Sequence, residues 1–283
     1  MQHILAAIDA SAYANSVCDL AAWASRRLEL PVELLHVVQR RDAVAARHDL
    51  SGAIGLGVKT NLMEELVRLE ESDAKLQVER GRALLAAGEK RLREGGAAEV
   101  RTLHRHGGIV ETILEREADA RLVIMGKRGA GHEFASEHIG SKIERVVRAS
   151  DRPILIASRE LIEPGEIVFA YDASKAAGRA LERLLNSPLL ANLPVHLVMA
   201  DEGDRANRQA LEDAAGALRS SRAVRTTLRV GKPEAVIAEI VEQTPGAMLL
   251  MGAFGHSPLR TLIVGSTTTA MIRIVHAPVL LVR

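Results

Sequence analysis

The residues best suited to chemistry lie near the C-terminus, where glycines and hydroxyl side chains follow an apolar segment. The pattern is Gly-x-x-Gly, then nine residues, then Gly-Ser-Thr, and it comes directly after residues 247–251. Its members are Gly252, Gly255, Gly265, Ser266 and Thr267. Glycines let backbone N–H groups approach an anion, and a helix N-terminus adds donors and a favourable dipole. The pattern predicts a phosphate-binding turn between a buried strand and a helix, although such glycines also permit a tight turn without a ligand.

A second copy of this pattern occurs in the first half of the chain. After the apolar residues 123–125 come Gly-Lys-Arg-Gly, ten residues, and Gly-Ser. The corresponding candidates are Gly126, Lys127, Gly129, Gly140 and Ser141. The longer spacer is expected to move this loop away from the phosphates. Alternatively, Lys127 and Arg128 compensate by adding positive charge, although both side chains are equally compatible with a solvated surface. Repetition of this kind indicates a duplicated unit.

Apolar strand-like segments alternate with helical segments in both halves, an order that predicts parallel sheets covered on both faces. We therefore expect an α/β protein with two tandem, open, five-stranded parallel sheets. Expected strands in the first half are 4–8, 32–38, 100–106, 122–125 and 153–157, with helices at 14–28 and 108–118. In the second half they are 167–171, 195–199, 224–230, 248–251 and 279–282, with a helix at 176–185. A linker near 158–165 separates a domain at 1–158 from one at 166–283.

The two halves differ in length between their second and third strands. The sequence offset between the halves is 162 for Leu35 and Leu197, but 124 for Gly107 and Gly231, so the first half carries an insertion at about 39–76. Within it, leucines at 62, 66, 69 and 76 are spaced as on one face of a helix, which extends through Leu92 if the pattern continues. This helix packs on its own sheet or forms a lid or docking element over the first site.

Composition excludes several classes of protein. The net charge of +1 argues against a general nucleic-acid binder, and aromatic residues, at 2%, are too scarce for base-stacking platforms. Cys18 is the single cysteine, so no intrachain disulfide forms, and we expect a buried thiol. No apolar run is long enough for a membrane span, and residues 1–9 do not resemble a signal peptide. We expect a cytoplasmic protein.

No catalytic or metal site is predicted. Ser-His-Asp, Cys-His and Walker-type Lys-Ser/Thr arrangements are absent from the sequence. His132 and His138 are six residues apart, not the four that place two imidazoles on one helical face. His104 and His106 alternate on an expected strand and so face one way; an exposed or edge face explains them better than a metal. His36 on the neighbouring strand is interpreted as structural.

These features together resemble the universal stress protein family, and the duplication resembles its tandem members. The resemblance rests on an Asp after the first strand, a short apolar second strand and Gly-x-x-Gly-x9-Gly-Ser/Thr after the fourth. It implies a five-stranded parallel sheet with a nucleotide cleft at the C-terminal ends of the strands, in line with ligand binding at topological switch points. Many members bind ATP or related nucleotides, while others lack the glycines and do not. The resemblance also implies dimerisation through the last strand, which in a tandem chain would pair the two halves.

The resemblance assigns further site residues. Asp172 and Asp9 would bond the ribose or adenine, although Asp-Ala-Ser is also a normal helix entry. Met199 and Val37 end the second strands, where backbone groups would read the adenine edge; packing alone also explains them. His256 is either a phosphate contact or a solvent-facing residue.

Three classes of function remain open. The first is a stress regulator that binds ATP, or ADP or AMP, with Mg²⁺ accompanying the nucleotide, and that switches the surface shown to an unknown protein partner. The second is a weak ATPase or nucleotidyl enzyme, with slow turnover because groups for phosphoryl transfer are missing. The third is a scaffold or apolar-ligand-binding protein. Either a monomer with its halves paired or a homodimer fits the sequence.

Overall fold

The computed structural model describes residues 2–38, 56–129, 141–201, 205–253 and 266–283. Several sequence candidates lie outside these ranges, namely Gly140, Gly255, His256, Gly265, His132 and His138.

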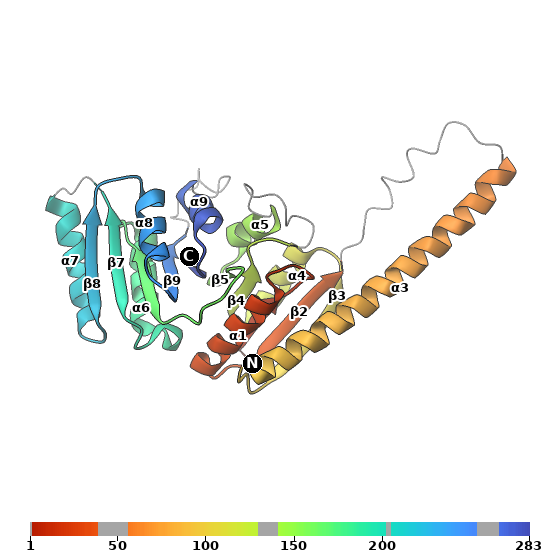
Figure 1. The fold of residues 1–283 in the computed structure, drawn as a ribbon, viewed down its shortest axis with the longest axis horizontal. Coiled ribbons are helices and arrows are strands. Elements are labelled where there is room, and N and C mark those ends of the chain that lie inside the picture. Colours follow the sequence, from red (N-terminus) through yellow and green to blue (C-terminus); the bar gives the residue numbers. More distant parts are fainter. Residues whose placement is uncertain (1, 39–55, 130–140, 202–204, 254–265) are drawn as a thin grey trace.

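Strands and helices alternate along both halves, and the expected α/β class is confirmed (Figure 1). The first half contains β1 His3–Ala7, α1 Ala14–Leu28, β2 Val32–Val38, α3 Leu56–Glu94, β3 Val100–His106, α4 Ile109–Arg116, β4 Ala120–Gly126, α5 Ser141–Ala149 and β5 Ile154–Ala157. The second contains β6 Glu166–Ala170, α6 Lys175–Asn186, β7 Val195–Ala200, α7 Arg205–Arg219, β8 Val224–Arg229, α8 Pro233–Glu242, β9 Ala247–Gly252, α9 Ser266–Ile274 and β10 Val279–Val282.

All ten strands form one sheet, in the order β3-β2-β1-β4-β5-β10-β9-β6-β7-β8. Strands within each half run parallel, whereas β5 and β10 pair antiparallel with Leu155 opposite Leu280. The two expected sheets are therefore joined edge to edge through their last strands, within one chain. This joining covers an edge strand of each half, whose unpaired backbone groups would otherwise invite aggregation.

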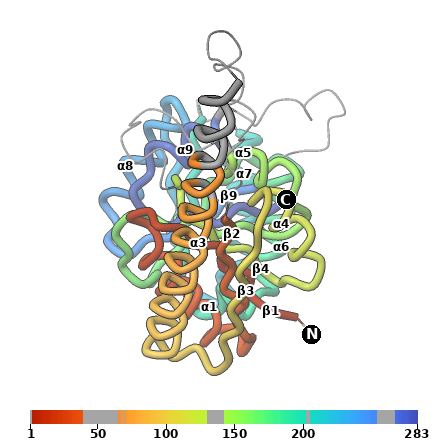
Figure 2. The backbone as a smooth tube through the Cα atoms, turned by 90° about the vertical axis from the view of Figure 1, so that its right-hand side faces the viewer, coloured from red at the N-terminus to blue at the C-terminus, as the bar shows by residue number. Residues whose placement is uncertain are grey.

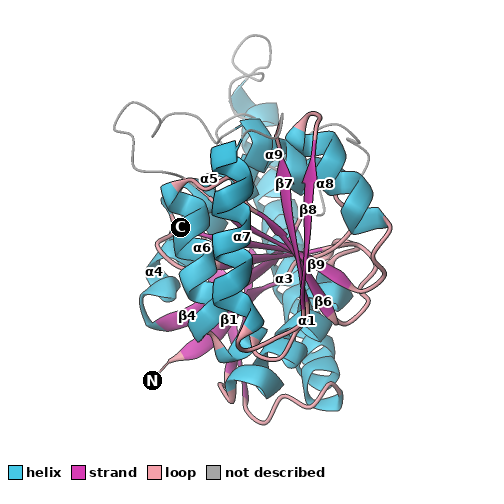
Figure 3. Ribbon diagram, turned by 90° about the vertical axis from the view of Figure 1, so that its left-hand side faces the viewer, coloured by secondary structure: helices cyan, strands magenta, loops and turns pink. Residues whose placement is uncertain are grey.

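Helices cover both faces of the sheet (Figure 3). One core lies under α1 and α3 in the first half and under α6 and α7 in the second. The other lies under α4 and α5 and under α8 and α9. The central strands are therefore buried on both faces and are apolar along their whole length, as parallel sheets require.

The described part of the insertion, residues 56–76, forms the N-terminal part of α3, a helix of 39 residues that continues to Glu94 (Figure 2). The face of α3 that packs on the sheet carries Gly81, Leu85, Gly88 and Leu92, which are buried at helical spacing. Leu69 and Leu76, expected to mark the packing face, are 60% and 46% exposed instead. That part of the prediction was wrong because the insertion extends beyond the sheet, and the helix docks only after Arg80.

Candidate functional site

The sheet has a topological switch point in each half. Strand β1 lies between β2 and β4, and β6 lies between β7 and β9. The register places Ala7 beside Met125, and Ala170 beside Met251. The chain leaving β1 or β6 therefore starts next to the chain leaving β4 or β9, at the C-terminal edge where open α/β sheets bind ligands. Each predicted Asp is brought toward the predicted glycine turn of its own half.

Both aspartates organise the turn that starts the following helix. Oδ1 of Asp172 accepts a hydrogen bond of 3.0 Å from the Ser174 N–H, and Oδ1 of Asp9 accepts one of 3.2 Å from the Ser11 N–H. The Ser174 hydroxyl in turn caps α6 by accepting from the Ala177 N–H. Both aspartates are thus turn residues, one of the roles that the sequence left open, whereas a side-chain cap is present at the start of α6 and not of α1. The turn uses Oδ1 of each carboxylate, and Asp172 remains exposed.

The second half holds this turn in a strained conformation. Ala173, between Asp172 and Ser174, has φ of 55°, in the left-handed region that costs a non-glycine residue about 1 kcal/mol. Ala10, its counterpart in the first half, does not have a positive φ. Such strain is concentrated at ligand sites in proteins, so it marks the second turn as the more specialised of the two.

The first glycine of each turn permits close packing. A Cβ on Gly252 would lie 2.4 Å from the backbone carbonyl carbon of Ala176, in the first turn of α6. A Cβ on Gly126 would lie 2.5 Å from the Cβ of Tyr13. These glycines therefore have a packing reason that is independent of any ligand.

Gly129 lies against the predicted aspartate of its own half. A Cβ on Gly129 would approach Oδ2 of Asp9 to 2.8 Å. The structure thus brings Asp9 and the first glycine loop together, and Asp9 is half-buried. The loop after β4 partly covers the first carboxylate, whereas Asp172 in the second half is exposed.

Lys127 points away from the turn that it was expected to serve. Its side chain is buried, and its ammonium donates a hydrogen bond to the backbone carbonyl of Val275, just after α9 in the other half. Burial, and secondarily the charge of Arg128, lowers the pKa of Lys127 to about 8. The interpretation as a solvated surface residue was wrong, because the side chain crosses the boundary between the halves and stabilises a helix C-terminus.

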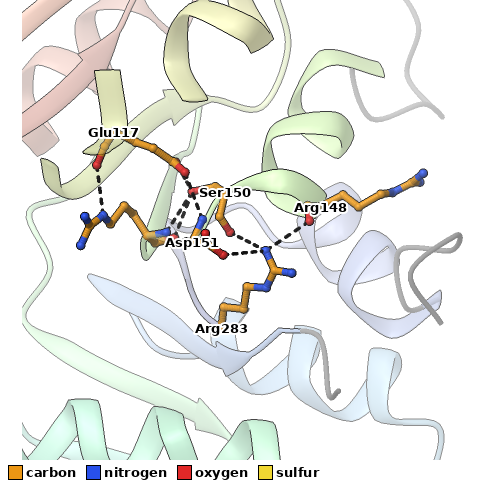
Figure 4. A network of polar contacts seen from close by, with 6 residues as sticks. Glu117, Arg148, Ser150, Asp151 and Arg283 are labelled. Atoms are coloured by element: carbon orange, nitrogen blue, oxygen red, sulfur yellow. Dashed lines mark hydrogen bonds and ion pairs between the residues drawn. The ribbon is translucent and has the colours of Figure 1, made fainter. Parts of the chain in front are cut away.

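A second cation crosses the same boundary in the opposite direction. The guanidinium of Arg283 donates to the carbonyl of Ser150 at 2.9 Å and to Oδ1 of Asp151 at 3.3 Å, at the end of α5 (Figure 4). The two cations are not equivalent residues of the repeat. The second half has Ala253 at the position equivalent to Lys127, and the first half has Ser158 at the position equivalent to Arg283. Each half thus caps the last helix of the other by a different route.

The helix starts predicted after both turns are present. Ser141 begins α5, and Ser266 begins α9 with Thr267 next. The side chains of Ser141 and Ser266 are not among those described, and Thr267 is half-buried. Two helix N-termini therefore follow the glycine turns, as a phosphate cradle requires.

Val37 and Met199 are not equivalent positions, contrary to the expectation. Ile4 pairs with Val32 and Ile167 pairs with Val195, so the true offset for the second strand is 163. A slip of one residue moves every side chain to the other face of a sheet. Met199 is accordingly buried on the α6 and α7 side, and Val37 on the α4 and α5 side. Met199 corresponds to His36.

Sequence reasoning missed a hollow at the same edge of the first half. It has a volume of about 310 Å³ and is lined by residues 107–111 together with Lys142 and Arg145. The start of α4 and two basic residues of α5 meet there, with Arg145 paired to Glu111 at 2.7 Å. The doubled glycine at 107 and 108, followed by an apolar helix, was the available signal.

Two further kinds of site were sought in the described part of the chain. No three His, Cys, Asp or Glu side chains within it are arranged to hold a metal ion. None of its helices combines the length and apolar character needed to cross a membrane.

Comparison with known proteins places this geometry in a family. The sequence profile of the Universal stress protein family matches residues 1–158 and again 165–283. The chain belongs to the universal stress protein family. The resemblance to this family that the sequence indicated is thereby confirmed, and the two matches confirm that the chain is a tandem member.

Some relatives match this chain over nearly its whole length. The Universal stress protein Slr1230 of Synechocystis sp. is 33% identical over 288 residues, covering all of both chains. Among solved structures, a universal stress protein from Archaeoglobus fulgidus matches with a TM-score of 0.66 at 21% identity, over 99% of this chain and 98% of the other. A putative universal stress protein from Pseudomonas aeruginosa matches with a TM-score of 0.57 at 15% identity, over 99% and 92%. At these identities the two structures establish the shared fold.

Proposed function

We propose that this universal stress protein binds an adenine nucleotide, ATP in the first instance, at the C-terminal edge of the second half. One observation carries the proposal: the exposed carboxylate of Asp172 and the turn after Gly252 leave adjacent strands at a topological switch point. A carboxylate accepts hydrogen bonds from ribose hydroxyls, and the start of α9 supplies N–H donors for phosphates.

The second half is the stronger candidate for four reasons. Its spacer between glycines has the family's nine residues. Asp172 is exposed, whereas Asp9 lies under Gly129. Its aspartate turn holds the strained Ala173. In the first half the only lysine of the glycine turn is committed to the other domain.

The proposed consequence of binding is regulatory. Nucleotide orders the turn after β9 and the start of α9, and so changes the surface presented to a partner protein. A ligand shifts such an equilibrium only by its difference in affinity for the two states.

Small molecules released from natively purified protein, identified by mass spectrometry, provide the first test. Calorimetry with ATP, ADP and AMP on nucleotide-free protein provides the second. We expect one dominant site that prefers the triphosphate. Protein that releases no nucleotide and shows no heat with any of the three would contradict the proposal and favour a scaffold or apolar-ligand role.

A further inference from the structure

Three histidines of the first half form a contiguous group that the nucleotide site does not use. His36 on β2 and His104 on β3 have ring centroids 5.5 Å apart, and His104 and His106 are 5.8 Å apart. The Nδ1 atom of His36 lies 2.9 Å from the carbonyl oxygen of Ile8, so Nδ1 must carry the proton that is donated. The expectation of an exposed or edge face is met in part: β3 is an edge strand and His106 is exposed, whereas the ring of His104 is half-buried.

Helix α3 packs directly on these rings. A Cβ on Gly81 would lie 2.5 Å from Nε2 of His104 and 2.8 Å from Cδ2 of His36. Nε2 of His104 is buried and has no hydrogen-bond partner among the described residues. A glycine at this position therefore lets the helix backbone close over an imidazole nitrogen that has no hydrogen-bond partner among the described residues.

The second half lacks this arrangement. Its strand register places Met199 at the position of His36 and Leu228 at that of His104. Helix α7 therefore packs on apolar side chains where α3 packs on imidazoles. Because the second half packs with Met199 and Leu228 at these positions, packing alone does not require histidines there. The histidines of the first half therefore point to a property that apolar side chains lack.

That property is charge that depends on pH. The pKa of His104 is lowered by burial first, then by His36, His106 and Arg82 of α3. Each of these neighbours therefore disfavours a positive charge on His104. Arg82 is itself paired with Glu79 on the exposed side of α3. On α1, the Cys18 thiol lies against α3 and is neutral in this range because burial raises its pKa to about 12, while Asp19 is paired with Arg91 of α3 at 2.6 Å.

We propose that His36, His104 and His106 form an acid-sensitive latch that holds α3 on the sheet at neutral pH and releases it in mild acid. Protonation would place a cation beneath the Gly81 backbone, among like charges and without an acceptor. Release of α3 would uncover the β2–β3 face beside Asp9. The proposal is independent of nucleotide binding.

The direction of the effect follows from proton linkage. The docked state has a lowered pKa for His104, so the released state binds more protons below the ordinary value of 6.5. Docking is therefore fully stable above pH 6.5 and weakens as the pH falls below it. For one such histidine the equilibrium population of released α3 rises by up to about tenfold between pH 7.5 and pH 5.5.

The chain contains its own reporter of docking. Cys18, the single cysteine, is buried on α1, and a Cβ on Gly88 of α3 would lie 3.3 Å from its Sγ atom. Release of α3 would uncover this thiol. Its rate of reaction with dithiodipyridine, which reacts with thiols in mild acid, is measured at pH 7.5 and 5.5. Each rate is divided by that of urea-unfolded protein at the same pH, which removes the effect of pH on the thiol.

We expect the corrected reaction rate of the Cys18 thiol in wild-type protein to rise up to about tenfold between pH 7.5 and pH 5.5. In His104→Leu, which introduces the leucine found at the equivalent position of the second half, the corrected rate should not change with pH. His36→Met serves the same purpose if His104→Leu does not fold. His196→Gln, a change at a buried histidine of β7, should keep the acid response.

Amide hydrogen exchange is the second measurement: on lowering the pH, exchange should rise in residues 82–93 of α3 but not in residues 205–219 of α7. A flat wild-type rate, a response that persists in His104→Leu, or equal loss of protection in α7 would each overturn the latch.

Discussion

The two halves of this protein share one fold but treat the same edge of the sheet differently. In the second half the aspartate after the first strand is exposed and its turn is strained at Ala173. In the first half the corresponding Asp9 lies under Gly129, and the lysine of the glycine turn crosses to the other half. Duplication thus preserved the frame at both sites, while the side chains that would meet a ligand diverged.

The covering helices differ in the same way. Helix α7 packs on Met199 and Leu228 and has the length of an ordinary crossover helix, whereas α3 packs on histidines and runs for 39 residues. The difference suggests a division of labour, in which the second half binds a ligand and the first half carries elements that respond to conditions.

The largest effect is expected from filling the space at the first glycine of the second turn. Gly252→Ala puts a methyl group 2.4 Å from the Ala176 backbone, which cannot move without shifting α6. We expect the free energy of unfolding to fall by about 3 kcal/mol. Gly126→Ala meets a side-chain atom of Tyr13 instead, and a smaller loss of about 1–2 kcal/mol is expected. Urea denaturation of both variants measures the difference, and an equal loss would show that the two turns are packed alike.

The next effect concerns the two cations that cross between the halves. Because the pKa of Lys127 is about 8 in the folded protein against an ordinary 10.5, the unfolded chain binds more protons between these values. Wild-type stability should therefore rise with pH from 8 to 10.5 relative to Lys127→Met, by up to about 1.4 kcal/mol per pH unit.

The matched control is Arg283→Met, which removes the reciprocal contact at α5. Arginine does not titrate in this range, so the stability difference between this variant and wild type should be independent of pH. A pH-independent difference for Lys127→Met as well would contradict the burial of its ammonium.

Much of this fold could be predicted from the sequence because the signals are local. The limits of α1, β2, β3 and β10 were predicted to the residue, from helical periodicity in α1, apolar runs in β2 and β10 and alternation in β3. The helices α7 and α8 were not identified, and the docking face of α3 was assigned to the wrong side. Its face carries Gly81 and Gly88, seven residues apart, beside the buried Leu85 and Leu92, and close approach at glycines is a signal that hydrophobic periodicity does not reveal.

The candidate site was predicted less completely. Placing Asp9 near Gly129 required only the order of the strands, which the alternation of elements implies. The destination of Lys127 required knowledge of how β5 and β10 pair, which depends on contacts distant in sequence. The equivalence of Val37 and Met199 failed because an alignment of short apolar strands does not distinguish one register from the next.

ATP affinity should distinguish Asp172 from Asp9. Asp172→Asn keeps an oxygen for the Ser174 N–H but replaces the second acceptor oxygen by an NH2 donor, so we expect ATP affinity to fall about tenfold. Asp9→Asn should change it by less than twofold. Calorimetry on both variants decides between them, and the reverse ranking would move the nucleotide site to the first half.

The smallest effect distinguishes the two covering helices. A Cβ on Gly216 of α7 meets no atom within 4 Å, so Gly216→Ala should raise stability by about 0.5–1 kcal/mol through helix propensity. On α3, Gly88→Ala would approach Cδ2 of Leu34 to 2.8 Å and should lower it instead. Thermal unfolding of both variants gives the signs, and a gain in both would show that α3 is packed loosely.

The most direct test of the nucleotide site is a crystal structure of the protein grown with ATP. Our account predicts a nucleotide at the C-terminal ends of β6 and β9, with its ribose on the Asp172 carboxylate and its phosphates at the turn between Gly252 and Ser266. A crevice closed by the protein's own side chains, or ATP bound elsewhere on the molecule, would contradict it.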